Sequence, residues 1–173
     1  MHEVGAPAVR LLIEAATRRG IDVTHALEAL RAPREALRDP AARFDWDDYV
    51  QFIARLEVLA GGAAGMRRLG EDYVHASTEL PALLALFDEP MDFFRFVITR
   101  YAPAMVTPLV PQFDRLSTDG FRVTVAIEPP YPPSAPLLCA LEGALGALPA
   151  HTGQAGGEVQ ADIGEARATF VVR

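Results

Sequence analysis

Residues 133–148 read PSAPLLCALEGALGAL, and this apolar stretch decides the predicted fold. Its leucines recur at spacings of three and four, the period of one helix face: Leu137, Leu138, Leu141, Leu145 and Leu148. Two strand-like segments precede this helix, at 109–116 and 121–128, and two follow it, at 158–163 and 167–173. A helix with so much apolar surface is expected to lie on a sheet. The order β-β-α-β-β therefore predicts a sheet of two hairpins with this helix across it.

The strand assignments depend on alternation and on proline. Apolar residues alternate with polar ones from Phe121 to Glu128, which is typical of a half-buried strand. Pro111 has no N–H to donate to a central ladder, so residues 109–116 are expected at a sheet edge. Gly120 closes a turn between these two segments and favours a hairpin.

The N-terminal half is predicted to be helical. Apolar residues at helical spacing indicate helices over 7–19 and 25–31, a helix that begins at Asp45 and ends at Gly61, and shorter ones over 66–74 and 80–87. An aromatic helix spans 91–105, and Pro103 is expected to end or kink its last turn. The predicted class is α+β: one domain, with a helical part (1–106) packed on a four-stranded, mostly antiparallel sheet of the β-β-α-β-β part (107–173). We expect it to be the N-terminal piece of a longer regulator.

Composition narrows the function classes. The formal net charge of −7 disfavours contact with nucleic acid, which requires a basic face. Cys139 is the single cysteine, which excludes an internal disulfide and fits a reducing compartment. No apolar run approaches the roughly 18 residues that span a membrane, so we expect a soluble, cytoplasmic module with no membrane contact.

The aromatic helix is the strongest candidate for a binding site. It carries more bulky apolar side chains than one contact stripe needs, and such a surplus can line an enclosed pocket between this helix and the sheet. The candidate ligand-binding residues are Phe94, Ile98, Tyr101, Met105, Trp46, Arg95 and Cys139. Arg95 and Arg100 are the two candidates for anchoring an acidic group at the rim, with surface charges as the alternative. Core packing is the alternative for the apolar members and for Cys139.

No pattern predicts catalysis or a metal centre. Glu71 and His75 lie at i and i+4 on one helix face, but no further ligands follow, so a solvated helix face explains them. The chain lacks a phosphate-binding glycine loop, GxSxG and HExxH. We therefore expect a chain that is not an enzyme and has neither metal nor cofactor. A haem with His75 as its axial ligand is kept as an alternative.

Several short motifs resemble those of bacterial sensory domains. Residues 9–12 (VRLL), 19–22 (RGID), 39–40 (DP) and 44–49 (FDWDDY) resemble the arabinose-binding-type domain of AraC-like transcription regulators. Together with 140–149 (ALEGALGALP), 159–161 (VQA) and 168–170 (ATF), they are similar to the N-terminal sensory domains of some myxobacterial histidine kinases. The C-terminal half also resembles haem nitric-oxide-binding and V4R domains, although the haem signature YxSxR is missing here.

The resemblance implies an input domain for signal transduction, followed in the same polypeptide by a kinase of a two-component system or by a DNA-binding unit. Our hypothesis is a sensor that binds an apolar or amphipathic small molecule between the aromatic helix and the sheet. One alternative is a ligand-free module for dimerisation or protein interaction. A third is a haem-based gas sensor.

Overall fold

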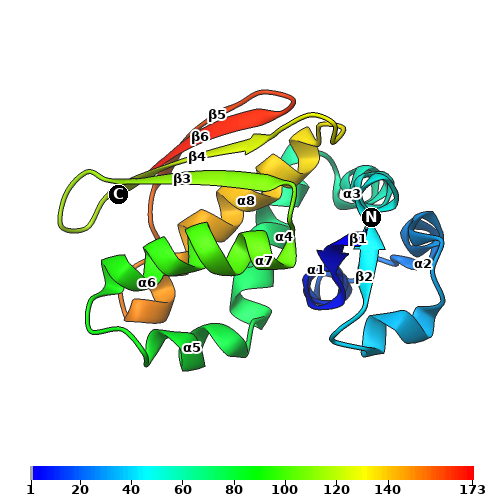
Figure 1. Cartoon of the computed structure of the whole chain (residues 1–173), viewed down its shortest axis with the longest axis horizontal. Helices are drawn as coiled ribbons and strands as arrows, with labels where there is room; N and C mark the ends of the chain where they lie inside the picture. Colours follow the sequence, from blue (N-terminus) through cyan, green and yellow to red (C-terminus); the bar gives the residue numbers. More distant parts are fainter. Residues whose placement is uncertain (1) are drawn as a thin grey trace.

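The computed structural model describes residues 2–173, and Figure 1 shows a sheet on one side of a mostly helical body. The strands are β1 (His2–Gly5), β2 (Arg43–Asp45), β3 (Leu109–Arg115), β4 (Phe121–Ile127), β5 (Val159–Ile163) and β6 (Arg167–Val172). The α-helices are α1 (Ala6–Arg18), α2 (Thr24–Leu27), α3 (Trp46–Ala60), α4 (Ala63–Ala76), α5 (Glu79–Leu84), α6 (Pro90–Phe96), α7 (Ala102–Met105) and α8 (Ala135–Ala147). Shorter helical turns are η1 (Glu28–Leu30), η2 (Arg34–Arg38), η3 (Val97–Tyr101) and η4 (Leu148–Thr152).

The larger sheet confirms the predicted α+β class. Its strand order is β3-β4-β6-β5, and every neighbouring pair is antiparallel. The strand with Pro111 lies at an edge, as its missing N–H required. The inward side chains of β4 are buried: Phe121, Val123, Val125 and Ile127. Helix α8 runs beneath this face, so the sheet has one covered side and one open side (Figure 1).

Helix α8 carries apolar side chains on nearly all of its faces. Two other elements cover it, which accounts for this pattern. One side faces the sheet, and another packs against α4. At Gly70 and Gly143 the two backbones approach so closely that a Cβ would lie 1.7 Å from the Ala140 carbonyl oxygen and 1.8 Å from that of Arg67, respectively. A helix that is hydrophobic all round is expected in such a buried position. The sheet, α8 and α4 therefore form three successive layers.

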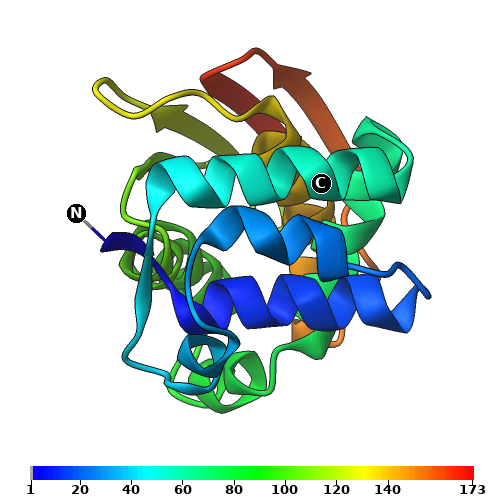
Figure 2. The ribbon, with the colours of Figure 1, turned by 90° about the vertical axis from the view of Figure 1, so that its right-hand side faces the viewer.

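The N-terminal helices form a separate layer at one end of the molecule. Figure 2 shows α1, α2 and α3 stacked there beside the small β1–β2 sheet. The sequence did not predict β1 and β2, because strands of four and three residues carry too little alternation to detect. The carboxylate of Glu3 on β1 is buried and accepts a hydrogen bond from the Trp46 backbone N–H at 3.0 Å. This strand thereby caps the first turn of α3.

The predicted aromatic helix is present but is not one regular α-helix. It consists of α6, a π-helical turn (η3) and α7. The N–H of Ala102 bonds to the Val97 carbonyl, five residues back. Pro103 explains the wide turn, because it cannot donate to the Thr99 carbonyl and its ring would clash there. The expected disturbance at Pro103 thus falls in the turn before it.

The end of α7 is joined to the small sheet. Val4 and Val106 form an antiparallel bridge, and the Thr107 N–H donates to the Glu3 carbonyl at 3.1 Å. The guanidinium of Arg43 donates to the same Glu3 carbonyl at 2.7 Å and to the Ala104 carbonyl at 3.2 Å. Within residues 2–173, no helix combines the length and hydropathy needed to cross a bilayer.

Candidate functional site

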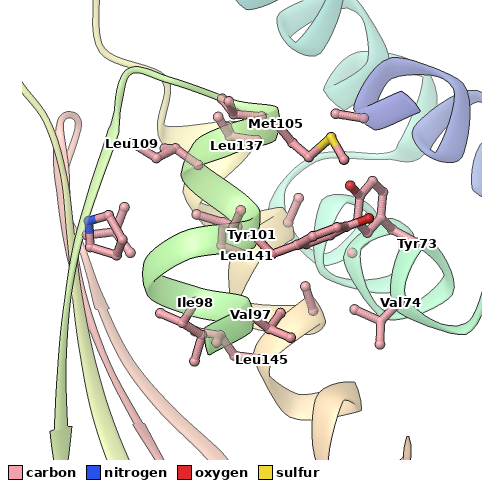
Figure 3. A pocket seen from close by; sticks show the side chains of 18 of the residues that line it. Tyr73, Val74, Val97, Ile98, Tyr101, Met105, Leu109, Leu137, Leu141 and Leu145 are labelled. Carbon is pink, nitrogen blue, oxygen red and sulfur yellow. The ribbon is translucent and has the colours of Figure 1, made fainter. Parts of the chain in front are cut away.

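An apolar cavity of about 140 Å³ lies inside the helical body. Figure 3 shows η3 and α7 in the middle of the view, with the sheet on one side of them, α4 on the other side and α8 behind. Six labelled residues mark its walls: Val74, Val97, Ile98, Leu109, Leu141 and Leu145. Side chains from α1, α3 and α5 complete the lining. The cavity thus lies where α1, α3, α4, α8 and the helix of η3 and α7 meet the strands β3 and β4.

Every described residue of the lining is uncharged. Most are aliphatic, and the polar atoms come from three tyrosines and one serine: Tyr49, Tyr73, Tyr101 and Ser77. Transfer of an ionised group into such surroundings is costly unless the group is paired. The cavity therefore favours a neutral and largely apolar occupant.

Tyr73 and Tyr101 lie close together on the side of the cavity away from the sheet (Figure 3). The Tyr101 hydroxyl donates to a carboxylate oxygen of Glu79 at 2.5 Å. Burial is the main cause that raises the pKa of all three tyrosines, and it brings the pKa of Tyr73 to about 12. For Tyr101, the hydrogen bond to Glu79 raises the pKa further. All three phenols are therefore protonated at neutral pH.

Ser77 contributes an unpaired hydroxyl to the lining. It lies at the C-cap position of α4, and 5% of its surface is exposed. Its N–H donates to the Val74 carbonyl at 3.2 Å, but its Oγ has no hydrogen-bond partner among the described residues. A buried hydroxyl without a partner costs about 1–3 kcal/mol, so such groups are uncommon in folded proteins.

Three of the residues predicted from the sequence line the cavity: Ile98, Tyr101 and Met105. They come from η3 and α7, and the sheet supplies the facing Leu109 and Val123. The cavity thus contacts both of the elements between which the sequence placed a pocket. Whether these residues bind a ligand stays a prediction.

The other four candidate residues lie outside the lining. Phe94 is buried against β4, with its ring centroid 5.4 Å from that of Phe121. Trp46 is buried, and its Nε1–H donates to the Pro132 carbonyl at 2.9 Å. These contacts give both aromatic residues a place in the core.

Arg95 and Cys139 also have their own surroundings. Arg95 is exposed, pairs with Asp92 at 3.7 Å, and places its guanidinium carbon 5.8 Å from the centroid of the Phe113 ring. Cys139 is buried on α8, and burial raises the pKa of its thiol. A raised pKa leaves little of the thiolate that a nucleophile or metal ligand requires.

His75 is exposed on α4 and does not line the cavity. Its ring centroid lies 6.3 Å from that of His151, whose Nε2 lies 3.2 Å from the Val74 carbonyl oxygen. Within residues 2–173, no three His, Cys, Asp or Glu side chains are placed together to hold a metal ion. In the described residues, His75 therefore lies outside the cavity.

Sequence reasoning missed the contribution of α4 and α8 to the site. Tyr73, Ser77 and Leu141 line the cavity, yet none was a candidate. For α8 a signal existed, because its apolar surface exceeded what contact with a sheet requires. For Ser77 there was none, because a serine after a helix is usually read as a cap or a turn.

Comparisons with known proteins give a structural likeness only. No protein-family profile matches the chain, and neither does any curated protein. Among solved structures, the unliganded Fe(II) H-NOX protein from K. algicida has a TM-score of 0.64 and 10% identity, with 100% of this chain and 96% of that chain covered. An H-NOX protein from S. oneidensis in the Fe(II)NO state has a TM-score of 0.65 and 12% identity, with 98% of each chain covered. A mutant of T. tengcongensis H-NOX has a TM-score of 0.65 and 14% identity, with 98% and 96% covered.

These neighbours correct one expectation. We predicted a module without a cofactor, and that prediction is contradicted because solved structures that resemble this chain over nearly its whole length are of haem domains, some described with their Fe(II) state. The likeness to haem nitric-oxide-binding domains, predicted from the sequence for the C-terminal half, extends over the whole chain. The structure therefore has the fold of H-NOX domains.

Proposed function

We propose that this chain is a sensory domain in which a small molecule bound in the central cavity shifts a conformational equilibrium. The observation that carries the proposal is the cavity itself. An apolar cavity of about 150 Å³ in another protein stays dry and binds benzene or xenon, and the present one has nearly that volume and a mostly aliphatic lining. A single-ring molecule is thus the size of ligand to expect.

The position of the cavity supports a sensing role. It is bordered by a π-helical turn, and such turns are frequent at functional sites. Val106 follows the end of this helix and forms a bridge with Val4 of β1. A movement of η3 would therefore displace Val106 and Val4. A ligand biases such an equilibrium only by binding one state more tightly than the other. The resemblance to kinase and AraC-like input domains supports an output domain in the same polypeptide. A second copy of the chain, in a homodimer, is a further proposed partner.

Toluene is a suitable first probe because it is neutral, apolar and close to the cavity in size. We expect saturable binding that raises the thermal midpoint, with about 2.7 kcal/mol of added stability at one hundred times the Kd. Hydrogen exchange should slow in η3 and also at β1, outside the cavity. Ala144→Leu, which fills space in the lining, should abolish binding, whereas Ala64→Leu on the exposed face of α4 should leave it unchanged. Equal binding by both variants would disprove the cavity site.

A second candidate function is haem-based gas sensing, favoured by the H-NOX fold of the chain. The residues of the cavity do not fit a haem. Its described lining contains no histidine or cysteine, burial disfavours the tyrosinate forms of Tyr49, Tyr73 and Tyr101, and only the thioether of Met105 is left as an axial ligand. Its volume is also below the roughly 300–1,000 Å³ of pockets for drug-sized ligands.

Titration of the purified chain with haemin decides between the two candidates. A sharp Soret band at one equivalent, lost in Tyr101→Phe or Met105→Leu, would establish haem and replace the single-ring ligand. A broad absorption that follows free haemin, together with toluene binding, would leave the small-molecule sensor as the function. His75→Ala is the matched control, because His75 lies outside the lining.

A further inference from the structure

The unpaired hydroxyl of Ser77 gives the cavity a chemical preference. Among the described side chains, only the Oγ atoms of Ser77 and Ser134 are buried without a hydrogen-bond partner, and only Ser77 lines the cavity. Buried polar groups in folded proteins nearly always have a hydrogen-bond partner. Protein atoms within residues 2–173 do not supply one.

Water is a poor candidate for that partner. A buried water typically makes about three hydrogen bonds and needs at least two polar partners. Ser77 offers one, at the end of α4, and the other polar side-chain atoms of the described lining are the three tyrosine hydroxyls, of which that of Tyr101 already donates to Glu79. The lining residues closest to Ser77 in the chain are Val74 and Leu80, which are aliphatic, and Tyr73, which carries a hydroxyl. A molecule with an apolar body and one polar group suits this arrangement better than water does.

We propose that the cavity selects a small neutral amphipathic molecule, of the size and type of phenol, whose single hydrogen-bonding group pairs with the Ser77 hydroxyl. This inference rests on the proposed function and adds the class of ligand to it. The volume of about 140 Å³ limits the body to one ring or an equivalent short chain. The uncharged lining excludes ligands that are ionised at neutral pH.

The test is a double-mutant cycle with phenol and toluene as a matched ligand pair and Ser77→Ala as the variant. Phenol loses more hydration than toluene on binding, but this cost is the same for both proteins and cancels in the cycle. We expect Ser77→Ala to raise the ratio of the phenol Kd to the toluene Kd by about three- to tenfold, the range of one net hydrogen bond. The toluene Kd alone should change little.

Two further variants distinguish a hydrogen bond between phenol and Ser77 from a structural effect of the Ser77→Ala substitution. Ser134→Ala removes the other buried, unpaired hydroxyl, at the N-cap of α8 and outside the lining, and should leave the ratio unchanged. Ser77→Thr keeps a hydroxyl and should retain most of the wild-type ratio. A ratio that is the same in wild type and Ser77→Ala would overturn the Ser77 assignment while toluene binding upholds the cavity. Failure of both probes to bind the wild type would overturn the proposed function as well.

Discussion

At the residue scale, Gly70 sets how closely α4 and α8 approach. A Cβ at this position would lie 1.7 Å from the Ala140 carbonyl oxygen and 2.6 Å from its carbonyl carbon. Backbone atoms within a helix cannot rotate away as a side chain can, so the two helices would have to separate. We predict that Gly70→Ala lowers the free energy of unfolding by about 3 kcal/mol or more. Urea denaturation followed by circular dichroism measures this loss.

Gly156→Ala is the matched control for that substitution. Gly156 is exposed, and a Cβ there would lie 3.4 Å from the Gly146 carbonyl oxygen, its nearest neighbour. Its free energy of unfolding should change by less than about 0.5 kcal/mol. Similar losses in both variants would refute the close approach of α4 to α8.

The residues of the site were predictable only in part. Ile98, Tyr101 and Met105 belong to an aromatic helix whose surplus of bulky side chains is visible in the sequence. Phe94 comes from the same surplus but faces Phe121. Which face of a helix borders a cavity depends on the neighbours it acquires in the fold, and periodicity alone does not contain that information.

At the element scale, the sequence predicted long and periodic elements well and short or irregular ones poorly. The strands β3, β4 and β6 are six or seven residues long, and the hairpin turn at Gly120 predicted the antiparallel pairing of β3 with β4. The strand β2 has three residues, which is too few for a period. The π-helical turn was missed for another reason, because its aromatic stripe reads as an ordinary helix until the effect of Pro103 on the preceding turn is considered.

The π-helical turn η3 holds one residue more than an α-helical turn, and this residue can be tested by deletion. Ile98 and Tyr101 both line the cavity, three positions apart. Deletion of Thr99 would leave them two positions apart, where helical side chains do not share a face. We expect the variant to fold, with toluene affinity reduced at least about tenfold, as measured by calorimetric titration.

Deletion of Ala155, in the exposed link before β5, is the corresponding control and should leave toluene affinity unchanged. If the Thr99 deletion also bound toluene normally, η3 would have no role in shaping the cavity. If both deletions unfolded the chain, circular dichroism would report it before any binding measurement.

At the scale of the whole molecule, the cavity joins ligand binding to stability because every layer contributes to its walls. Three of the four tyrosines of the chain meet there, and each is expected to keep its proton beyond the pH at which an unfolded tyrosine ionises. Tyrosine in an unfolded chain has a pKa of about 10. The contribution of these tyrosines to the free energy of unfolding is therefore fully present below pH 10.

Above that pH the unfolded chain loses protons that the folded chain retains, so the free energy of unfolding must fall as pH rises. The fall continues until the folded tyrosines ionise, which for Tyr73 is near pH 12. We predict a decline of about 1 kcal/mol per pH unit for each tyrosine that keeps its proton. Urea denaturation at pH 9, 10 and 11, with tyrosinate absorbance recorded in parallel, measures the slope. Tyr101→Phe removes one ionising group and should make the decline shallower, whereas a stability that stays level from pH 10 to 11 would contradict the enclosure of these phenols.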